Sequence, residues 1–371
     1  MPWRIACLFG TRPEAIKMAP VVRALGATPD MRPLVIVTAQ HRELLDTTLA
    51  TFGIVPDHDL DLMTPDQTLE ALTARALVGC TELLRREKPD VVLVHGDTST
   101  TMAGAIAAYY AGIPVGHVEA GLRTGDKREP FPEEVNRRVA DVLTDLYFAP
   151  TASARENLLR EGVADSRIWV TGNTAVDAVL DVAARRAATQ MPARGRRIAV
   201  EVHRRESFGA PLRDVVLALR DIARAFPDVE LLWSVHPNPN VGPVVRELMA
   251  EEPRVRLIPP SEYPDWVGVL AGSHLLVTDS GGLQEEAPAL HLPVVCTRNK
   301  TERPEAVAAG TVVLAGTERQ SVFDSVARLL RDPEAYRRCA EAPNPFGDGH
   351  ASERIVAAIR GYLEPVSRPR Q

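Results

Sequence analysis

Three acidic positions in the first half of the chain follow, or open, well-patterned segments. Asp97 and Glu119 come just after the apolar runs Val91–His95 and Val115–Val118, and Glu133 opens an amphipathic stretch. Carboxylates gathered at one place repel one another, so their clustering costs stability. Such clusters are candidates for general acid and base catalysis. For Asp97 taken alone, a helix N-cap is an equally good interpretation.

A cation stands where a helix is expected to begin. Gly10 and Pro13 are typical of a tight turn into a helix. Arg12 lies between them, at the end of the helix where the dipole disfavours positive charge. A bound anion such as phosphate would resolve this conflict. The alternative is a surface arginine that pairs with Glu14.

The second half of the chain gathers groups suited to a nucleotide. His203 follows the apolar run Ile198–Val202, and His236 follows another such run. The segment Thr278–Glu286 passes from a strand through two glycines into a helix, which leaves N–H groups available to cradle a pyrophosphate. For the acids at its end, a place in the first helical turn is the alternative interpretation. The expected phosphate or ribose contacts are Ser280, Gly281, Gly282, Glu286 and, further on, Arg303.

These positions need a scaffold that brings strand ends together. Short apolar runs alternate with amphipathic stretches, which favours parallel sheets covered by helices on both faces. The strands predicted in the first half are 4–9, 34–38, 91–95, 115–118, 146–149 and 168–171. Those predicted in the second half are 198–202, 230–235, 255–258, 275–278, 293–296 and 311–314. Ligands of such sheets bind beyond the carboxyl ends of the strands, where the polar residues above are found.

Two successive β/α series predict two doubly wound, Rossmann-like domains. The strand ending before Gly172 and Asn173 suggests a boundary there. We therefore expect an N-terminal domain over residues 1–172 and a C-terminal domain over 173–354. A final helix, predicted over 351–363, and the segment 355–371 are expected to join the N-terminal domain.

Composition excludes several classes of protein. The chain has 371 residues, 45% hydrophobic and 25% charged, as in ordinary folded proteins. A net charge of −6 and 5% aromatic residues argue against nucleic acid binding, and no apolar span reaches the length of a membrane helix. The cysteines are widely separated, which predicts free thiols in a reducing cytoplasm. They are Cys7, Cys80, Cys296 and Cys339.

Sequence patterns for common cofactors are absent. The chain has neither the glycine pattern of dinucleotide-binding proteins nor a P-loop, and no histidine pair has metal-ligand spacing. Asp59-Leu60-Asp61 resembles the acidic triplet of metal-dependent sugar transferases, but its proline-flanked setting predicts a solvated loop. We therefore expect no cofactor and no metal, with arginine, lysine and helix ends handling the charge of a nucleotide.

Taken together, the motifs resemble the non-hydrolysing bacterial UDP-N-acetylglucosamine 2-epimerases. The similarity runs from Gly10 to about Ser352. The matching blocks are GTRPEAIKMAP (10–20), TAQHRELLD (38–46), VHGDTST (94–100), PVGHVEAGLRTGD (114–126), PFPEEVNRR (130–138), HRRESFG (203–209), HPNPNV (236–241), TDSGGLQEEAP (278–288) and TERPEAV (301–307). The resemblance implies a GT-B fold, a homodimer, and reversible conversion of UDP-N-acetylglucosamine to UDP-N-acetylmannosamine.

The resemblance also implies roles for individual residues. Asp97, Glu119 and Glu133 would act as acids and bases or position the sugar. His203 and Arg12 would act on the diphosphate, and Lys17 would line the site. The UDP contacts implied are Ser280, Gly282, Glu286, Arg303, and Trp266 near the uracil, where many members have phenylalanine.

Some members of that family carry a second, regulatory site for UDP-N-acetylglucosamine. Gln40, His41 and Gln67 match positions of that site, whereas Asp66 stands where regulated members have arginine.

Inverting carbon 2 requires its weakly acidic hydrogen to leave and return on the other face. Elimination of UDP to 2-acetamidoglucal, followed by re-addition, would achieve this. The alternatives are a GT-B glycosyltransferase, a 2-epimerase of a more decorated UDP-sugar such as a diacetamido uronate, a hydrolysing epimerase, and a nucleotide-sugar sensor.

Overall fold

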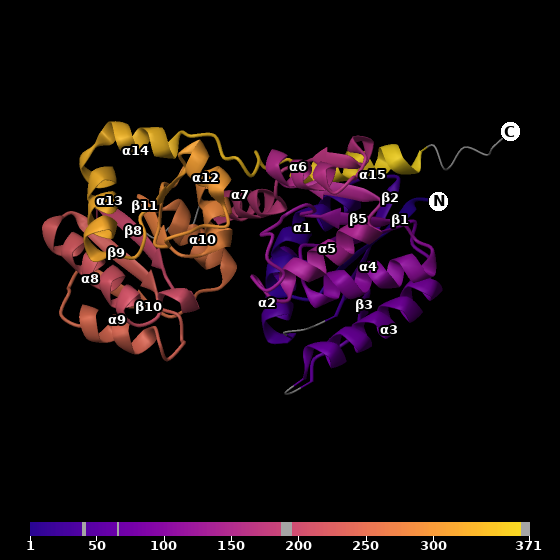
Figure 1. Ribbon diagram of the computed structural model, residues 1–371, viewed down its shortest axis with the longest axis horizontal. Helices are drawn as coiled ribbons and strands as arrows, with labels where there is room; N and C mark the ends of the chain where they lie inside the picture. The colour runs from indigo at the N-terminus through magenta and orange to yellow at the C-terminus, as the bar shows by residue number, and fades with distance from the viewer. Residues whose placement is uncertain (39–41, 65–66, 187–194, 365–371) are drawn as a thin grey trace. The chain divides into compact units, whose positions relative to one another are not determined.

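The computed structural model describes residues 1–38, 42–64, 67–186 and 195–364. Its internal contacts divide the chain into two compact units, which Figure 1 shows with the chain coloured by residue number. The first unit is Met1–Ala178 together with the chain from Gly347 onward, and the second unit is Val179–Phe346.

The first unit is built on a parallel sheet of seven strands in the described part of the chain, in the order β3-β2-β1-β4-β5-β6-β7. Alternate residues of β1 pack on opposite faces, so that Ile5 and Cys7 join one apolar cluster and Ala6 and Leu8 join another. Both faces are therefore buried, which explains the unbroken apolar runs in the sequence. The strands are β1 (Trp3–Phe9), β2 (Met31–Val37), β3 (His58–Asp59), β4 (Val91–His95), β5 (Val115–Val118), β6 (Leu146–Ala149) and β7 (Ile168–Val170).

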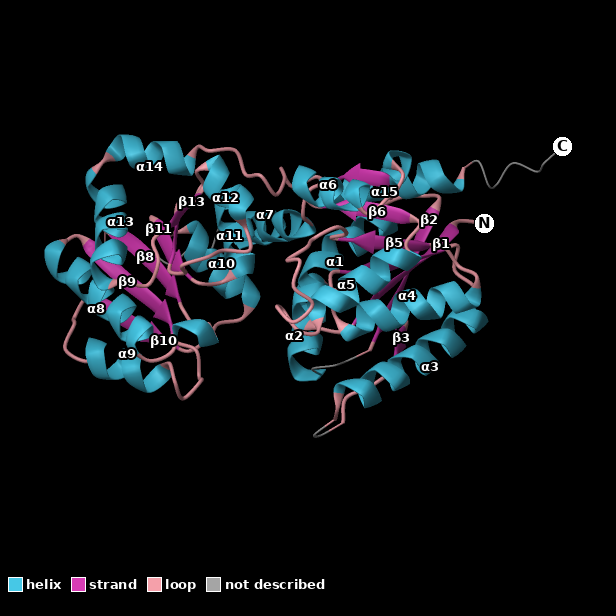
Figure 2. Cartoon of the chain, in the orientation of Figure 1, coloured by secondary structure: helices cyan, strands magenta, loops and turns pink. Residues whose placement is uncertain are grey.

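Helices cover both faces of this sheet (Figure 2). On one face α1 and the C-terminal helix α15 pack against each other, and on the other α3 and α4 do so. The helices are α1 (Arg12–Gly26), α2 (Arg42–Phe52), α3 (Leu69–Glu87), α4 (Ser99–Ala111), α5 (Glu133–Leu143), α6 (Ala152–Arg160), α7 (Thr174–Arg186) and α15 (Ala351–Leu363), with a 3-10 turn at Asp165–Arg167.

The second unit has a parallel sheet in the order β10-β9-β8-β11-β12-β13. Its strands are β8 (Arg196–Glu201), β9 (Val229–Ser234), β10 (Val255–Ile258), β11 (Leu275–Thr278), β12 (Val294–Cys296) and β13 (Val312–Leu314). Its helices are α8 (Ala210–Ala225), α9 (Gly242–Met249), α10 (Tyr263–Ala271), α11 (Gly281–Glu286), α12 (Pro304–Ala309), α13 (Arg319–Arg331) and α14 (Pro333–Ala340), with 3-10 turns at Arg205–Ser207 and Ala287–Leu290. The prediction of two doubly wound parallel-sheet domains is confirmed.

The chain passes between the units at places that differ from the predicted boundaries. The first crossing lies between Ala178 and Val179, inside α7, rather than after residue 172. The first turns of α7 are buried in the first unit, and Asp177 accepts hydrogen bonds from the backbone N–H groups of Ala351 and Ser352 at the start of α15. Because of the same contacts, the second unit ends at Phe346 rather than at the predicted residue 354.

Two local elements differ from the sequence-based expectation. Asp59 belongs to the two-residue edge strand β3 rather than to a loop. The helix predicted to follow the two glycines at 281 and 282 ends at Glu286 and continues as a 3-10 turn. That turn contains Pro288, whose ring nitrogen carries no N–H for an α-helical bond. In the described chain, no helix combines the length and apolarity that crossing a membrane requires.

Candidate active site

Glu119 sits in a strained turn just after β5. Its φ angle is +72°, which is uncommon for a residue with a side chain. The backbone N–H groups of Glu119 and Ala120 both donate to the carbonyl of Phe148, at 3.0 and 3.1 Å. Oε1 of Glu119 accepts hydrogen bonds from Lys17 Nζ (2.5 Å) and from Asn173 Nδ2 (2.8 Å). The turn and its donors therefore hold this carboxylate in one orientation, as strained residues at functional sites often are.

A buried histidine lies beside this carboxylate. His95 is the last residue of β4, 3% exposed, and its Nε2 is 3.9 Å from Oε2 of Glu119. Within the described chain, neither ring nitrogen has a hydrogen-bond partner. Burial lowers the pKa of His95 to about 3, although Glu119 acts in the opposite direction. A neutral imidazole therefore stands behind Glu119 at neutral pH.

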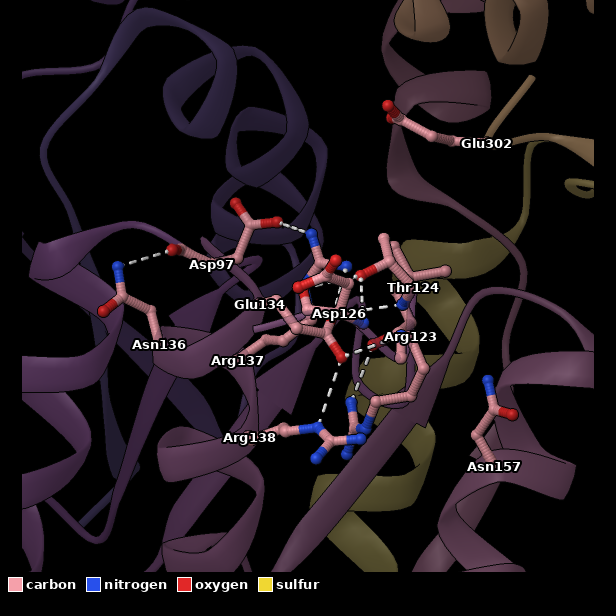
Figure 3. Close-up of polar contacts among 12 residues, drawn as sticks. Asp97, Arg123, Thr124, Asp126, Glu134, Asn136, Arg137, Arg138, Asn157 and Glu302 are labelled. Atoms are coloured by element: carbon pink, nitrogen blue, oxygen red, sulfur yellow. Dashed lines mark hydrogen bonds and ion pairs between the residues drawn. The ribbon is translucent and has the colours of Figure 1, made fainter. Parts of the chain in front are cut away.

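Asp97 follows β4 in the next turn and is held by helix α5. Its carboxylate pairs with Arg137, and its carbonyl oxygen accepts a hydrogen bond from Asn136 Nδ2 at 3.0 Å (Figure 3). The carboxylate of Asp97 remains about one-quarter exposed, at 28%. Asp97 is not the N-cap of α4, because Thr98 occupies that position.

Glu133 is the first residue of α5 and lines a cavity of about 330 Å³ in the first unit. Thr11, Thr98 and Asn136 line the same cavity. Oε2 of Glu133 is buried and has no hydrogen-bond partner among the described residues. Glu133 is therefore part of the cavity wall and has one carboxylate oxygen that no described residue binds.

The adjacent Glu134 has a different role. It is 1% exposed and accepts hydrogen bonds from the backbone N–H groups of Thr124 (3.1 Å) and Gly125 (3.3 Å). It also pairs with Arg137 and Arg138, at 3.3 and 3.2 Å (Figure 3). Of the two glutamates that open α5, one holds a loop and the other faces the cavity.

A buried polar network that the sequence reasoning missed anchors these turns. His117 is fully buried, with Nδ1 2.6 Å from Oδ1 of Asp141 and Nε2 2.7 Å from the carbonyl of Gly96. Asp141 also accepts hydrogen bonds from Gly121 N (3.2 Å) and Arg123 Nη2 (2.7 Å). Burial alone would raise the pKa of Asp141, but His117 and Arg123 hold it below its ordinary value.

The sequence did carry a signal for this network. Asn136, Arg137 and Asp141 lie on the same face of α5 as the buried Ala140. Charged residues on the inward face of a helix are seldom buried without partners, so their spacing indicated a polar network below the site.

At the start of α1, Glu14 does not pair with Arg12. Glu14 is 2% exposed; its Oε2 accepts from the backbone N–H groups of Gly10 and Thr11, and its Oε1 accepts from the hydroxyl of Thr98 at 2.7 Å. Burial raises the pKa of Glu14, although these hydrogen bonds act to lower it. Arg12 forms no hydrogen bond or ion pair with any residue in the described chain, so its charge is available to an anion.

In the second unit, Asp279 fixes the backbone that follows β8. Its carboxylate is fully buried and accepts hydrogen bonds from the backbone N–H groups of His203 (2.9 Å) and Arg204 (2.8 Å). The rings of His203 and His236 stack with centroids 5.1 Å apart. Burial, assisted by His236 and Arg204, lowers the pKa of His203, whereas Asp279 opposes the shift.

Two guanidinium groups face the start of α11. A Cβ atom added to Gly281 would lie 3.5 Å from Arg204 Nη2 and 3.8 Å from Arg303 Nη2. Arg303 is also paired through Nε with the buried Glu285. Ser280 precedes these glycines, and its hydroxyl forms no cap with the helix. Positive charge therefore converges where the sequence predicted a phosphate contact, and Arg204 is an addition to the predicted set.

The remaining predicted positions have mixed settings. Oε2 of Glu286 accepts from the hydroxyl of Tyr263 at 3.3 Å. Trp266 is 6% exposed and its Nε1 has no partner in the described chain, so little of its ring is available for stacking. Gln67 lines the same cavity as Glu133, while residues 40 and 41 lie outside the described residues. A search of the described residues finds no cluster of acids, histidines and cysteines suited to a metal ion.

Comparison with known proteins places the chain in a family. The family model described as UDP-N-acetylglucosamine 2-epimerase matches residues 23–360. The UDP-N-acetylglucosamine 2-epimerase of Escherichia coli strain K12 is 49% identical over 369 residues, covering 96% of this chain and 98% of that protein. The enzyme of the same name from Bacillus subtilis strain 168 is 48% identical over 360 residues, covering 96% and 94%.

A solved structure supports the same assignment. The crystal structure of UDP-GlcNAc 2-epimerase from Neisseria meningitidis bound to UDP-GlcNAc is 42% identical, covers 96% of this chain and 100% of that one, and has a TM-score of 0.88. The GT-B-like fold class is thereby confirmed. The chain belongs to the UDP-N-acetylglucosamine 2-epimerase family.

Proposed function

We propose that this protein reversibly interconverts UDP-N-acetylglucosamine and UDP-N-acetylmannosamine by inverting carbon 2 of the sugar. Family membership supports the reaction, and the substrate is the one bound in the Neisseria meningitidis structure. The observation that carries the proposal is the set of three carboxylates at the carboxyl edge of the first sheet. Glu119 is the most firmly held of the three.

The chemistry we propose is elimination followed by re-addition. A base removes the hydrogen of carbon 2 while the bond from carbon 1 to the diphosphate oxygen breaks, which yields 2-acetamidoglucal and UDP. The bond to UDP then re-forms as an acid returns a proton to carbon 2 from the opposite face. UDP takes the electron pair in the first step and gives it back in the second, so no redox cofactor is required.

In this scheme the first unit supplies the proton-transfer groups. Asp97, Glu119 and Glu133 share the acid and base roles, and Lys17 lines the site beside Glu119. Arg12 is the cation of this unit that we place on the diphosphate. General acids and bases of this kind contribute about 10²- to 10⁴-fold each to a rate.

The second unit holds the nucleotide in our proposal. His203 and Arg303 act on the diphosphate, where cations stabilise the charge that develops as UDP departs. Ser280, Gly281 and Gly282 bind phosphate through their polar backbone groups, and Glu286 accepts from the ribose. Trp266 is retained as the uracil contact, through the small part of the ring that is exposed.

The decisive experiment is incubation of the purified protein with UDP-N-acetylglucosamine in D₂O, followed by NMR at carbon 2. We expect both isomers at equilibrium, each carrying deuterium at carbon 2, with no acceptor present. Interconversion with the original hydrogen fully retained would overturn the elimination. Turnover that requires an acceptor would indicate a glycosyltransferase, and release of free N-acetylmannosamine would indicate a hydrolysing enzyme.

The same site raises a regulatory question. Gln67 shares the cavity that Glu133 lines, and we include it with Gln40 and His41 as a candidate set for a second sugar-nucleotide molecule. A sigmoidal dependence of rate on UDP-N-acetylglucosamine would support this, and a hyperbolic one would remove it.

We further propose a cytoplasmic homodimer. Helices α3, α4 and α5 are neighbours and expose the apolar side chains Val78, Tyr109, Tyr110 and Val142. A contiguous exposed apolar patch is a common mark of a protein–protein interface, and we propose that these side chains form one. Light scattering should therefore give about twice the 40.4 kDa of one chain. The four cysteines are free and buried, which suits a reducing compartment.

A further inference from the structure

Asn173 joins the candidate catalytic carboxylate to the start of helix α7. It follows the turn at Gly172 and is 3% exposed. Its Oδ1 accepts the backbone N–H of Ala175 at 2.9 Å, which caps α7, and its Nδ2 donates to Oε1 of Glu119 at 2.8 Å. One buried side chain thus serves both a helix end and a carboxylate from a distant part of the sequence.

The two contacts determine which way the amide faces. The two ends of an asparagine amide are distinguished by their hydrogen-bond partners. The N–H of Ala175 needs an acceptor because the first N–H groups of a helix have no partner within it. Oδ1 is therefore committed to α7, and the NH₂ group must face Glu119, whose carboxylate accepts. The helix cap sets the orientation of the donor.

The donor acts on one defined oxygen of Glu119. Lys17 from α1 and Asn173 both reach Oε1, whereas His95 and Gly96 lie on the side of Oε2. A Cβ atom added to Gly96 would be 3.2 Å from Oε2. Anchoring Oε1 from two elements leaves the carboxylate little rotational freedom and directs Oε2 away from α1 and α7.

We propose that Asn173 is a positioning residue for the acid–base chemistry of Glu119. This inference rests on the proposed function. It assigns Asn173 no contact with substrate, because Asn173 acts by orienting Glu119. Helix α7 runs from the first unit into the second between Ala178 and Val179. The side chain that caps this connecting helix is therefore the same one that orients Glu119. A hydrogen bond to a charged group is among the stronger kinds in proteins.

Three variants separate positioning from helix capping. Asn173→Asp and Asn173→Ser both keep an oxygen that caps α7. The aspartate variant replaces the donor to Glu119 with a like charge, and the serine variant is too short to reach it. Thr174→Val is the matched control, because the Thr174 hydroxyl is buried and has no hydrogen-bond partner in the described chain.

For both Asn173 variants we expect kcat to fall about 10- to 100-fold with KM changed less than threefold, as loss of one charged hydrogen bond predicts. UDP affinity should stay close to wild type in all three variants, and Thr174→Val should behave like wild type. The thermal midpoint should stay close to wild type in Asn173→Ser and fall in Asn173→Asp, which buries a second carboxylate beside Glu119. In Asn173→Asp the acidic limb of the kcat profile should move to higher pH, because a second carboxylate disfavours ionised Glu119. Lys17 and His95, the titratable groups that face Glu119 from α1 and β4, are unchanged in all three variants.

A second readout does not depend on turnover. Carbon-13 NMR of glutamate-labelled protein, with Glu119→Gln used to identify the signal, reports the titration of Glu119 directly. We expect its midpoint to rise in Asn173→Ser, because a donor to the charged form is lost. An unchanged midpoint, or kcat within twofold of wild type in both Asn173 variants, overturns the inference. Failure of the wild-type protein to interconvert the two sugars would overturn the proposed function instead.

Discussion

The three candidate carboxylates differ in their immediate surroundings. Glu119 is gripped at Oε1 by Lys17 and Asn173, whereas Asp97 is paired with Arg137 and partly exposed. Glu133 lines the cavity and has one buried oxygen without a hydrogen-bond partner in the described chain. Unequal environments are how enzymes separate acid from base roles among chemically similar groups. The arrangement suits proton removal and proton return by different residues.

Glu119→Gln should reduce turnover by at least about 10²-fold while UDP affinity stays within twofold of wild type. An amide keeps the shape of the side chain but cannot take a proton from carbon 2. Steady-state kinetics and calorimetry with UDP make the comparison, with the exposed Glu156→Gln as control. Turnover close to wild type in Glu119→Gln would remove Glu119 from the acid–base set.

His95 should make stability depend on pH. The pKa of His95 is about 3 in the folded protein and near its ordinary 6.5 in the unfolded chain. Between these values the unfolded state binds more protons, so the free energy of unfolding falls as pH falls below about 6.5. From pH 7 to pH 5 the wild type should lose about 2 kcal/mol more than His95→Phe.

Urea unfolding at each pH gives this difference, and the same substitution at the exposed His350 should leave the pH dependence as in wild type. Parallel curves for wild type and His95→Phe would show that His95 is not held neutral in the fold.

At the scale of elements, helix α5 organises the turns that carry the acids. Its Arg137 pairs with Asp97. Its Asp141 forms hydrogen bonds with His117, Gly121 and Arg123. The segment after β5 that contains Glu119 is thus tied to α5 at several points. Strain at Glu119 is sustained because its neighbours are held independently.

Asp141→Asn should therefore destabilise the protein by about 1–3 kcal/mol, because the buried His117 and Arg123 lose their charged acceptor and Arg123 keeps only Glu161 as an ion-pair partner. The exposed pair Asp165 and Arg155 provides the contrast, and Asp165→Asn should cost less than about 1 kcal/mol. Chemical denaturation measures both. Equal effects of the two substitutions would contradict the interpretation of Asp141 as a buried hub.

At the scale of the whole molecule, the chain returns to the unit in which it began. Ile355 and Ile359 of α15 are fully buried in the same cluster as Ile5 and Cys7 of β1. Arg360 pairs with Asp30 at 2.7 Å, and Asp177 caps the start of α15. The first unit is completed by the last helix of the described chain.

Ile359→Ala should lower the free energy of unfolding by about 2–5 kcal/mol, as large-to-small changes in a packed core do. Glu353→Ala, on the exposed face of the same helix, should change it by less than about 0.5 kcal/mol. Urea unfolding followed by tryptophan fluorescence compares the two. A negligible effect of Ile359→Ala would mean that α15 adds little to the first unit.

Local composition predicted most strands well because the central strands are buried on both faces. The bounds of β4, β5, β6 and β11 match the predicted runs, since unbroken apolar stretches are a direct record of burial. The bounds of β10 match as well, although this edge strand is only partly buried. The short edge strand β3 was not predicted, because its two polar residues form no apolar run. The position of the boundary inside α7 was not predicted, because it depends on contacts with α15, which is far away in sequence.

The sequence alone determined the family, the fold class and the positions at which acids and cations follow strands, because parallel strands bring their carboxyl ends to one edge. Tertiary structure decided what each of those side chains does. It assigned Glu134 to a loop and Glu133 to the cavity wall, and it brought Asn173 to Glu119. It also bound Glu14 to the backbone of Gly10 and Thr11 rather than to Arg12. Such pairings depend on distances between residues remote in sequence, and a linear pattern carries no record of them.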